Sequence, residues 1–79
     1  MKHEEICKWI EESIHNINSL LKLNRNDNLI ILGIDSIEYI TLMSKIEDKF
    51  NITIPDPLLN DEQFSSIEKI AEYIESQMI

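Results

Sequence analysis

The segment at residues 32–37 reads Leu-Gly-Ile-Asp-Ser-Ile, and it marks the start of the helix that decides the fold. Asp35 is a favourable N-cap residue, and Glu38 follows it three positions later, as in a capping box. The pattern predicts a helix from Ser36 to about Phe50. Its apolar residues recur at helical spacing and are Ile37, Ile40, Leu42, Met43, Ile46 and Phe50.

A long first helix is predicted at residues 2 to about 23. Its apolar residues recur at alternating spacings of three and four, which gives one stripe along the helix. The stripe consists of Cys7, Ile10, Ile14, Ile17 and Leu21, with Ile6 and Leu20 widening it. A helix of about 20 residues spans about 30 Å, the length of a small domain, so it can support a bundle.

Residues 24–35 are predicted to form a long connection. The first half is polar, which indicates a turn, and the second half is apolar. No strand is predicted, because the chain offers no second strand to pair with this segment. We expect Leu29 and Leu32 to hold the loop on the core.

The C-terminal part is predicted to contain a connector and two helices. Proline disfavours the helical region for the residue before it, so residues 52–55 (Ile-Thr-Ile-Pro) are expected to be extended, with both isoleucines turned inward. Residues 57–62 are predicted to form a short helix. Residues 65–68 (Ser-Ser-Ile-Glu) match a second capping box. The last helix then carries its apolar residues at Ile67, Ile70, Ala71, Ile74 and Met78.

Together these patterns predict an all-α fold, a four-helix bundle with a long loop between the first two helices and a short third helix. The 79 residues include one glycine and two prolines, too few turn residues for many short strands. At this length we expect residues 1–79 to form a single domain.

Cysteine usage and hydropathy bear on where the protein works. Cys7 is the one cysteine, so the chain has no internal disulfide, which suits a reducing compartment. No apolar stretch reaches the length of a membrane span, and residues 1–5 lack a signal-peptide pattern. We expect a soluble, monomeric protein in the cytoplasm.

The chain is strongly acidic, with 15 acidic against 7 basic residues and a formal net charge of −8. This balance argues against a nucleic-acid partner, since phosphate binding needs clustered lysine and arginine. It argues equally against anionic membrane surfaces. The charge is consistent both with attraction to basic patches on partner proteins and with a simple contribution to solubility.

No catalytic or metal-binding constellation is predicted. Cys7 and His15 are eight residues apart on one helix, about 12 Å along its axis, beyond the reach of a nucleophile–base pair. Cys7 is expected in the core, and His3 near a frayed terminus. There is no glycine-rich phosphate loop and no histidine or cysteine cluster spaced for a metal. We therefore expect neither an enzyme nor a metal site.

Two aromatic side chains, Trp9 and Tyr39, are expected at the margin of the core. Trp9 is expected to flank the apolar stripe or to lie partly exposed. Tyr39 follows Ser36 by about one turn, and such a tyrosine is most often half-buried with its hydroxyl in water.

Residues 32–37, together with the downstream segment 50–56 (Phe-Asn-Ile-Thr-Ile-Pro-Asp), resemble acyl and peptidyl carrier proteins. The resemblance extends from about Glu5 to Gln77. It implies that Ser36 receives covalent 4'-phosphopantetheine from coenzyme A through a phosphopantetheinyl transferase, and that Asp35 contributes to recognition by the transferase. A helix start offers unpaired N–H groups and a positive dipole, which favour a phosphate diester there.

The resemblance also implies that the second helix docks partner enzymes. The candidate docking residues are Ile37, Glu38, Met43, Glu47 and Asp48. The implied partners are an acyl- or aminoacyl-loading enzyme, either an adenylating ligase or an acyltransferase, and downstream synthase or condensing enzymes.

The charge of the second helix bears on the pathway. Residues 36–50 carry three acidic residues and two lysines, whereas carriers of bacterial fatty acid synthesis usually have a strongly acidic second helix. A carrier of a specialised polyketide or nonribosomal peptide pathway fits as well as a fatty-acid carrier or better. A D-alanyl carrier is a further possibility.

A second hypothesis is a cofactor-free, acidic helical adaptor that binds basic protein partners, with Ser36 as an ordinary helix-start residue. The two hypotheses differ at this serine. Ser36→Ala abolishes the function of a carrier but spares the fold and the binding activity of an adaptor.

Overall fold

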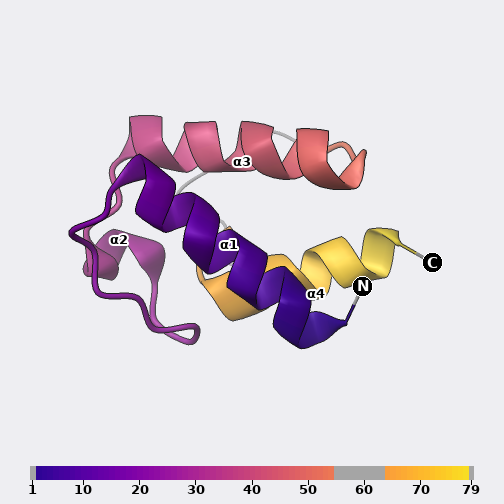
Figure 1. Cartoon of the computed structure of the whole chain (residues 1–79), viewed down its shortest axis with the longest axis horizontal. Helices are drawn as coiled ribbons and strands as arrows, with labels where there is room; N and C mark the ends of the chain where they lie inside the picture. Colours follow the sequence, from indigo (N-terminus) through magenta and orange to yellow (C-terminus); the bar gives the residue numbers. More distant parts are fainter. Residues whose placement is uncertain (1, 55–63, 79) are drawn as a thin grey trace.

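The computed structural model describes residues 2–54 and 64–78, and within these ranges the chain is all helical with no strand. The four helices are α1 (His3–Ile17), α2 (Leu29–Leu32), α3 (Ser36–Phe50) and α4 (Ile67–Gln77). Helix α1 contacts both α3 and α4, and Figure 1 shows it crossing the molecule between them. The predicted all-α class is confirmed. The short helix predicted at residues 57–62 lies outside the described residues.

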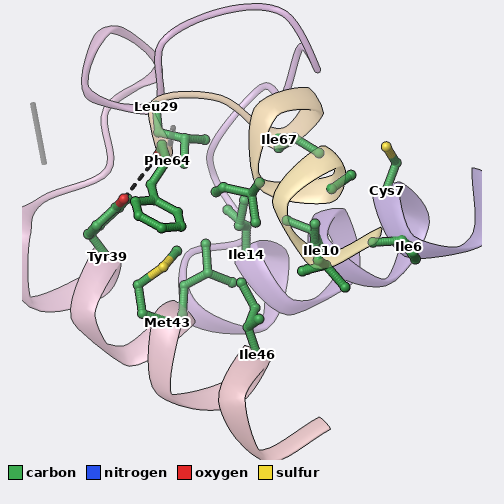
Figure 2. Packing of buried hydrophobic residues seen from close by; sticks show 14 of the residues in the cluster. Ile6, Cys7, Ile10, Ile14, Leu29, Tyr39, Met43, Ile46, Phe64 and Ile67 are labelled. Carbon is green, nitrogen blue, oxygen red and sulfur yellow. Dashed lines mark hydrogen bonds between the residues drawn. The ribbon is translucent and has the colours of Figure 1, made fainter. Parts of the chain in front are cut away.

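The core forms where the apolar face of α1 meets the other helices. On α1 the stripe begins as predicted, and its buried apolar residues are Ile6, Cys7, Ile10 and Ile14. The buried residues that complete the core come from α3 (Tyr39, Leu42, Met43 and Ile46) and from α4 (Ile67, Ile70, Ala71 and Ile74). Figure 2 shows the side chains of the three helices meeting in one cluster. Each helix therefore buries one face, as its spacing predicts.

The end of α1 differs from the prediction, because the helix stops at Ile17 rather than near residue 23. Asn18 is extended, and its side-chain oxygen accepts a hydrogen bond from the N–H of Leu20 at 3.1 Å. Asparagine side chains compete in this way with the helical ladder. As a result Leu20 is 89% exposed and does not widen the stripe, whereas Leu21 packs against the core from the loop.

The predicted long connection contains a short helix, α2. Asn28 caps it by accepting a hydrogen bond from the N–H of Ile30 at 2.8 Å. Leu29 is buried, and its own N–H donates to the carbonyl of Ser65 at 2.8 Å, which ties α2 to the segment before α4. Leu32 is partly buried against the core. The two leucines hold this segment in place as expected, but through a helical turn rather than an open loop.

The bounds of α3 agree with the prediction, but its buried face is rotated from the predicted one. Ile37 is 75% exposed and Ile40 is 55% exposed, while Tyr39 is buried. The hydroxyl of Tyr39 donates to the carbonyl of Phe64 at 3.0 Å (Figure 2), so the expectation of a hydroxyl in water is wrong. The carbonyl before α4 offers this buried hydroxyl a partner, which removes the main cost of burying it.

The connector after α3 turns inward as predicted. Ile54 is buried and Ile52 is partly buried against the core. The N–H of Ile54 donates to the Glu47 carboxylate at 2.7 Å, so a side chain of α3 holds the start of the connector. Trp9 is half-buried and packs edge-on against Phe50, with ring centroids 5.2 Å apart.

The start of α4 is shifted by one residue from the predicted capping box. Ser66 is the N-cap, and its hydroxyl accepts a hydrogen bond from the N–H of Lys69 at 3.2 Å. Glu68 consequently lies in the first turn, one position too early to complete the box, where its charge favours the positive helix end. At the other end Met78 follows the helix and is exposed rather than part of the apolar face.

The end of α1 can be tested with two substitutions. We expect Ile14→Ala to lower the free energy of unfolding by about 2–5 kcal/mol, because it leaves a cavity between packed helices. Leu20→Ala should change the free energy of unfolding by less than about 0.5 kcal/mol, because the side chain of Leu20 is exposed and lies outside the core. Urea unfolding followed by circular dichroism measures both, and comparable losses for the two variants would mean that α1 continues past Ile17.

Candidate functional site

The site is positioned by the turn that joins α2 to α3. Gly33 ends α2 with φ 110°, a left-handed conformation that side chains disfavour, and a Cβ there would lie 3.1 Å from Leu21. Its N–H donates to the carbonyl of Ile30, and the N–H of Ile34 donates to the carbonyl of Leu29, both at 3.1 Å. These bonds form a Schellman motif. Since Leu29 and Ile34 are both buried, the turn delivers the next residues to a defined place on the surface.

The predicted capping box opens α3. The Asp35 carboxylate accepts a hydrogen bond from the N–H of Glu38 at 2.8 Å, and the Glu38 carboxylate accepts one from the N–H of Asp35 at 3.0 Å. The box confirms that Asp35 is the N-cap and fixes Ser36 as the first residue of the helix.

Ser36 is exposed, and its hydroxyl makes no hydrogen bond with any described residue. The N–H groups of Ser36 and Ile37 likewise have no partner in the described ranges, whereas those of Glu38 and Tyr39 are bonded to Asp35. A free hydroxyl therefore stands beside two free amides at the positive end of a helix of 15 residues. This arrangement accepts a phosphate diester without displacing any existing contact.

Exposed apolar side chains flank this serine in the chain on both sides. They are Ile30 and Ile31 on α2 and Ile37 and Ile40 at the start of α3. We call these four residues the isoleucine group. Ile37 belongs to the predicted docking set. The other three were not predicted to be exposed, because apolar residues at such spacing normally indicate burial. The signal that could have found them is the number of apolar residues in 29–40, which exceeds what one buried face accommodates.

The remaining predicted docking residues have different surroundings. Asp48 is exposed, Glu38 is engaged in the capping box, and Glu47 is half-buried and bonded to the connector. Met43 is 2% exposed and packs inside the core (Figure 2), so its placement on an exposed docking face is wrong. It shares the inward face with Tyr39 and Ile46, three or four residues away on either side.

Comparison with known families decides the membership of the chain. The family model described as "Phosphopantetheine attachment site" matches residues 5–74, nearly the whole chain. The chain belongs to this family. Its members carry covalently attached 4'-phosphopantetheine, and the exposed serine at the start of α3 fits such a group.

A relative of this carrier domain is the mitochondrial acyl carrier protein of Neurospora crassa, which is 41% identical over 46 residues. The match covers 58% of the chain, and the chain spans 33% of the length of that relative. Both comparisons agree with the fold of a carrier domain. None of the helices in residues 2–54 and 64–78 is long and apolar enough to cross a bilayer.

Asp35 can be tested first as a structural residue of the carrier domain. We expect Asp35→Ala to lower the free energy of unfolding by about 1 kcal/mol, because the N–H of Glu38 loses its acceptor. Asp35→Asn should stay within about 0.5 kcal/mol of the parent, because asparagine caps helices as well as aspartate does. Urea unfolding curves check both values, and equal losses would show that the charge rather than the cap stabilises the helix start.

Proposed function

We propose that Ser36 carries the 4'-phosphopantetheine of this carrier domain and that the arm presents acyl or aminoacyl thioesters to partner enzymes. The observation that supports this assignment is the unbonded, exposed hydroxyl at the first residue of α3. When bound, the group supplies a terminal thiol on a long, flexible arm. The domain supplies a rigid helix start that keeps the attachment point away from the core.

The domain acts as a carrier and leaves the chemistry to its partners. The thiol of Cys7 is buried, and burial together with the neighbouring Glu68 raises its pKa to about 11, so it is a poor nucleophile. His15 is exposed and its ring contacts the carbonyl of Leu21 at 3.1 Å. Since no base of the described residues contacts Ser36, the transferase must activate its hydroxyl.

The isoleucine group is the surface on which partners would bind. Apolar residues at the centre of an interface contribute most of its binding free energy, and charges at the rim guide the approach. The isoleucine group flanks Ser36, and Asp48 lies farther along α3. The partners proposed are the phosphopantetheinyl transferase, an acyl- or aminoacyl-loading enzyme and downstream synthase or condensing enzymes.

The modest charge of α3 favours a specialised pathway. Three acidic residues and two lysines on residues 36–50 offer weaker attraction to a basic docking patch than a strongly acidic helix does. A polyketide or nonribosomal peptide pathway therefore fits better than housekeeping fatty acid synthesis, with a D-alanyl pathway as a further candidate. The lone, buried cysteine agrees with a cytoplasmic location.

Intact mass spectrometry tests the attachment site. After incubation with coenzyme A and a promiscuous phosphopantetheinyl transferase, we expect the protein to gain the mass of one phosphopantetheinyl group. Ser36→Ala should gain none, whereas Ser44→Ala, which removes an exposed serine from the same helix, should be modified like the parent. Modification of Ser36→Ala would move the site elsewhere. No gain by the parent with several transferases would favour the acidic adaptor instead.

The docking surface has its own test. We expect Ile37→Ala to lower kcat/KM of the transferase about tenfold, because it removes an apolar contact beside the attachment point without disturbing the core. Met78→Ala is the matched control, because this exposed methionine follows α4, and the end of α4 lies far from the start of α3 (Figure 1). Equal rates for Ile37→Ala and the parent would exclude Ile37 from the interface with the transferase.

A further inference from the structure

Three side chains able to bind a metal meet where the start of α1 faces the first turn of α4. His3 and Cys7 are four residues apart on α1, so they share one face of the helix. Glu68 approaches them from α4. One ligand atom from each of the three lies within 4.8 Å of the others. Figure 2 shows the sulfur of Cys7 at the margin of the core, pointing away from Ile6 and Ile10.

The ligand atoms lie near the separations found around a tetrahedral zinc ion. His3 Nε2 lies 3.5 Å from Cys7 Sγ and 2.7 Å from Glu68 Oε1, and Cys7 Sγ lies 3.8 Å from Glu68 Oε2. Bond lengths of about 2.0–2.3 Å and tetrahedral angles place such atoms about 3.3–3.6 Å apart. The separation of His3 Nε2 from Cys7 Sγ lies in this range. The other two distances are to different oxygens of Glu68, so its carboxylate would turn to bring one oxygen to this distance from both atoms.

The contact on the far side of the His3 ring is the one that zinc-bound histidines make. His3 Nδ1 is hydrogen-bonded to the carboxylate of Glu75, about two helical turns beyond Glu68 on α4. A carboxylate on the second ring nitrogen orients a histidine ligand and raises its basicity. Glu75 therefore directs Nε2 toward Cys7 and Glu68. The backbone of Glu68 is held in turn, because its N–H donates to the carbonyl of Arg25 at 2.9 Å.

The donor set selects the kind of metal. A thiolate, an imidazole and a carboxylate suit Zn²⁺, whereas Ca²⁺ and Mg²⁺ require oxygen ligands throughout. On binding, Zn²⁺ replaces the proton of the Cys7 thiol, which passes to solvent, and thiolate and carboxylate then balance the two positive charges. Cys7 is buried, but the side chains of His3 and Glu68 are 36% and 35% exposed. Zinc can thus enter from solvent, and water can serve as the fourth ligand.

We propose that His3, Cys7 and Glu68 form a Zn²⁺ site that joins the start of α1 to α4, with Glu75 orienting His3. The site lies at the opposite end of α1 from the attachment region at the start of α3 (Figure 1), so it does not depend on the proposed carrier function. No such cluster was predicted from the sequence, yet the fold brings these three side chains together. The sequence spacing hides it, because 61 residues separate Cys7 from Glu68.

Metal titration of the full chain without a histidine tag tests the proposal. The Ser36→Ala background is used throughout, because it removes the thiol of the arm as a competing ligand. We expect ZnCl₂ to bind with 1:1 stoichiometry in calorimetry and to raise the melting temperature. CoCl₂ should give the thiolate-to-cobalt absorption band of a tetrahedral site. Binding should weaken at least about 100-fold in His3→Gln or Cys7→Ser and about tenfold in Glu75→Gln.

Two control variants match the chemistry of the ligands. His15→Gln removes a histidine from the same helix and Glu72→Gln removes an exposed carboxylate from α4, and both should bind zinc like the background protein. His3 is half-exposed, so His3→Gln remains informative even if Cys7→Ser loses its fold, which circular dichroism monitors. Absence of 1:1 binding, lack of a thiolate–cobalt band, or equal binding by His3→Gln and His15→Gln would overturn the proposal.

Discussion

The structure depends on the burial of one face of α1 between α3 and α4. A chain of 79 residues has room for one small core, and the fully buried isoleucines of α1, at positions 6, 10 and 14, form its centre. Because α1 contacts both other long helices, loss of this packing would release all three at once. Neither α2 nor the turn before α3 could hold its position without the core surface on which Leu29 and Ile34 rest.

This packing has a direct consequence for the proposed attachment region around Ser36. Tyr39 points into the core, where its hydroxyl donates to the carbonyl of Phe64. With this face of α3 buried, Ile37 and Ile40 lie in solvent. The same register keeps Ser36 on the surface with a free hydroxyl. The local capping chemistry and the global packing thus agree, which is the consistency expected of a sequence that specifies one structure.

The two proposed sites lie at opposite ends of α1. One end lies near the turn that presents Ser36, and the other carries His3 and Cys7 against α4 (Figure 1). The proposed carrier function requires that partner enzymes reach the region around Ser36. A metal site far from that region can stabilise the domain without competing with these partners, since binding to the folded state alone raises stability.

Local interactions explain what the sequence by itself determined. The capping box of Asp35 and Glu38, the bounds of α3, the all-helical class and the position of Ser36 follow from residues within a few positions of one another. The family match agrees with the resemblance seen in residues 32–37. Short-range rules suffice for such features, because helix starts are decided by the next three or four N–H groups.

Only the tertiary structure decided which apolar residues are buried and which polar residues meet. Spacing alone placed Leu20 and Ile40 on the wrong sides, because several faces of a short helix can be apolar and packing selects one. The pairing of Cys7 with Glu68 could not be predicted, since it depends on how α1 and α4 align. The physical reason is the same in each case. Burial and contacts between distant segments depend on how the whole chain packs, so local sequence patterns do not determine them.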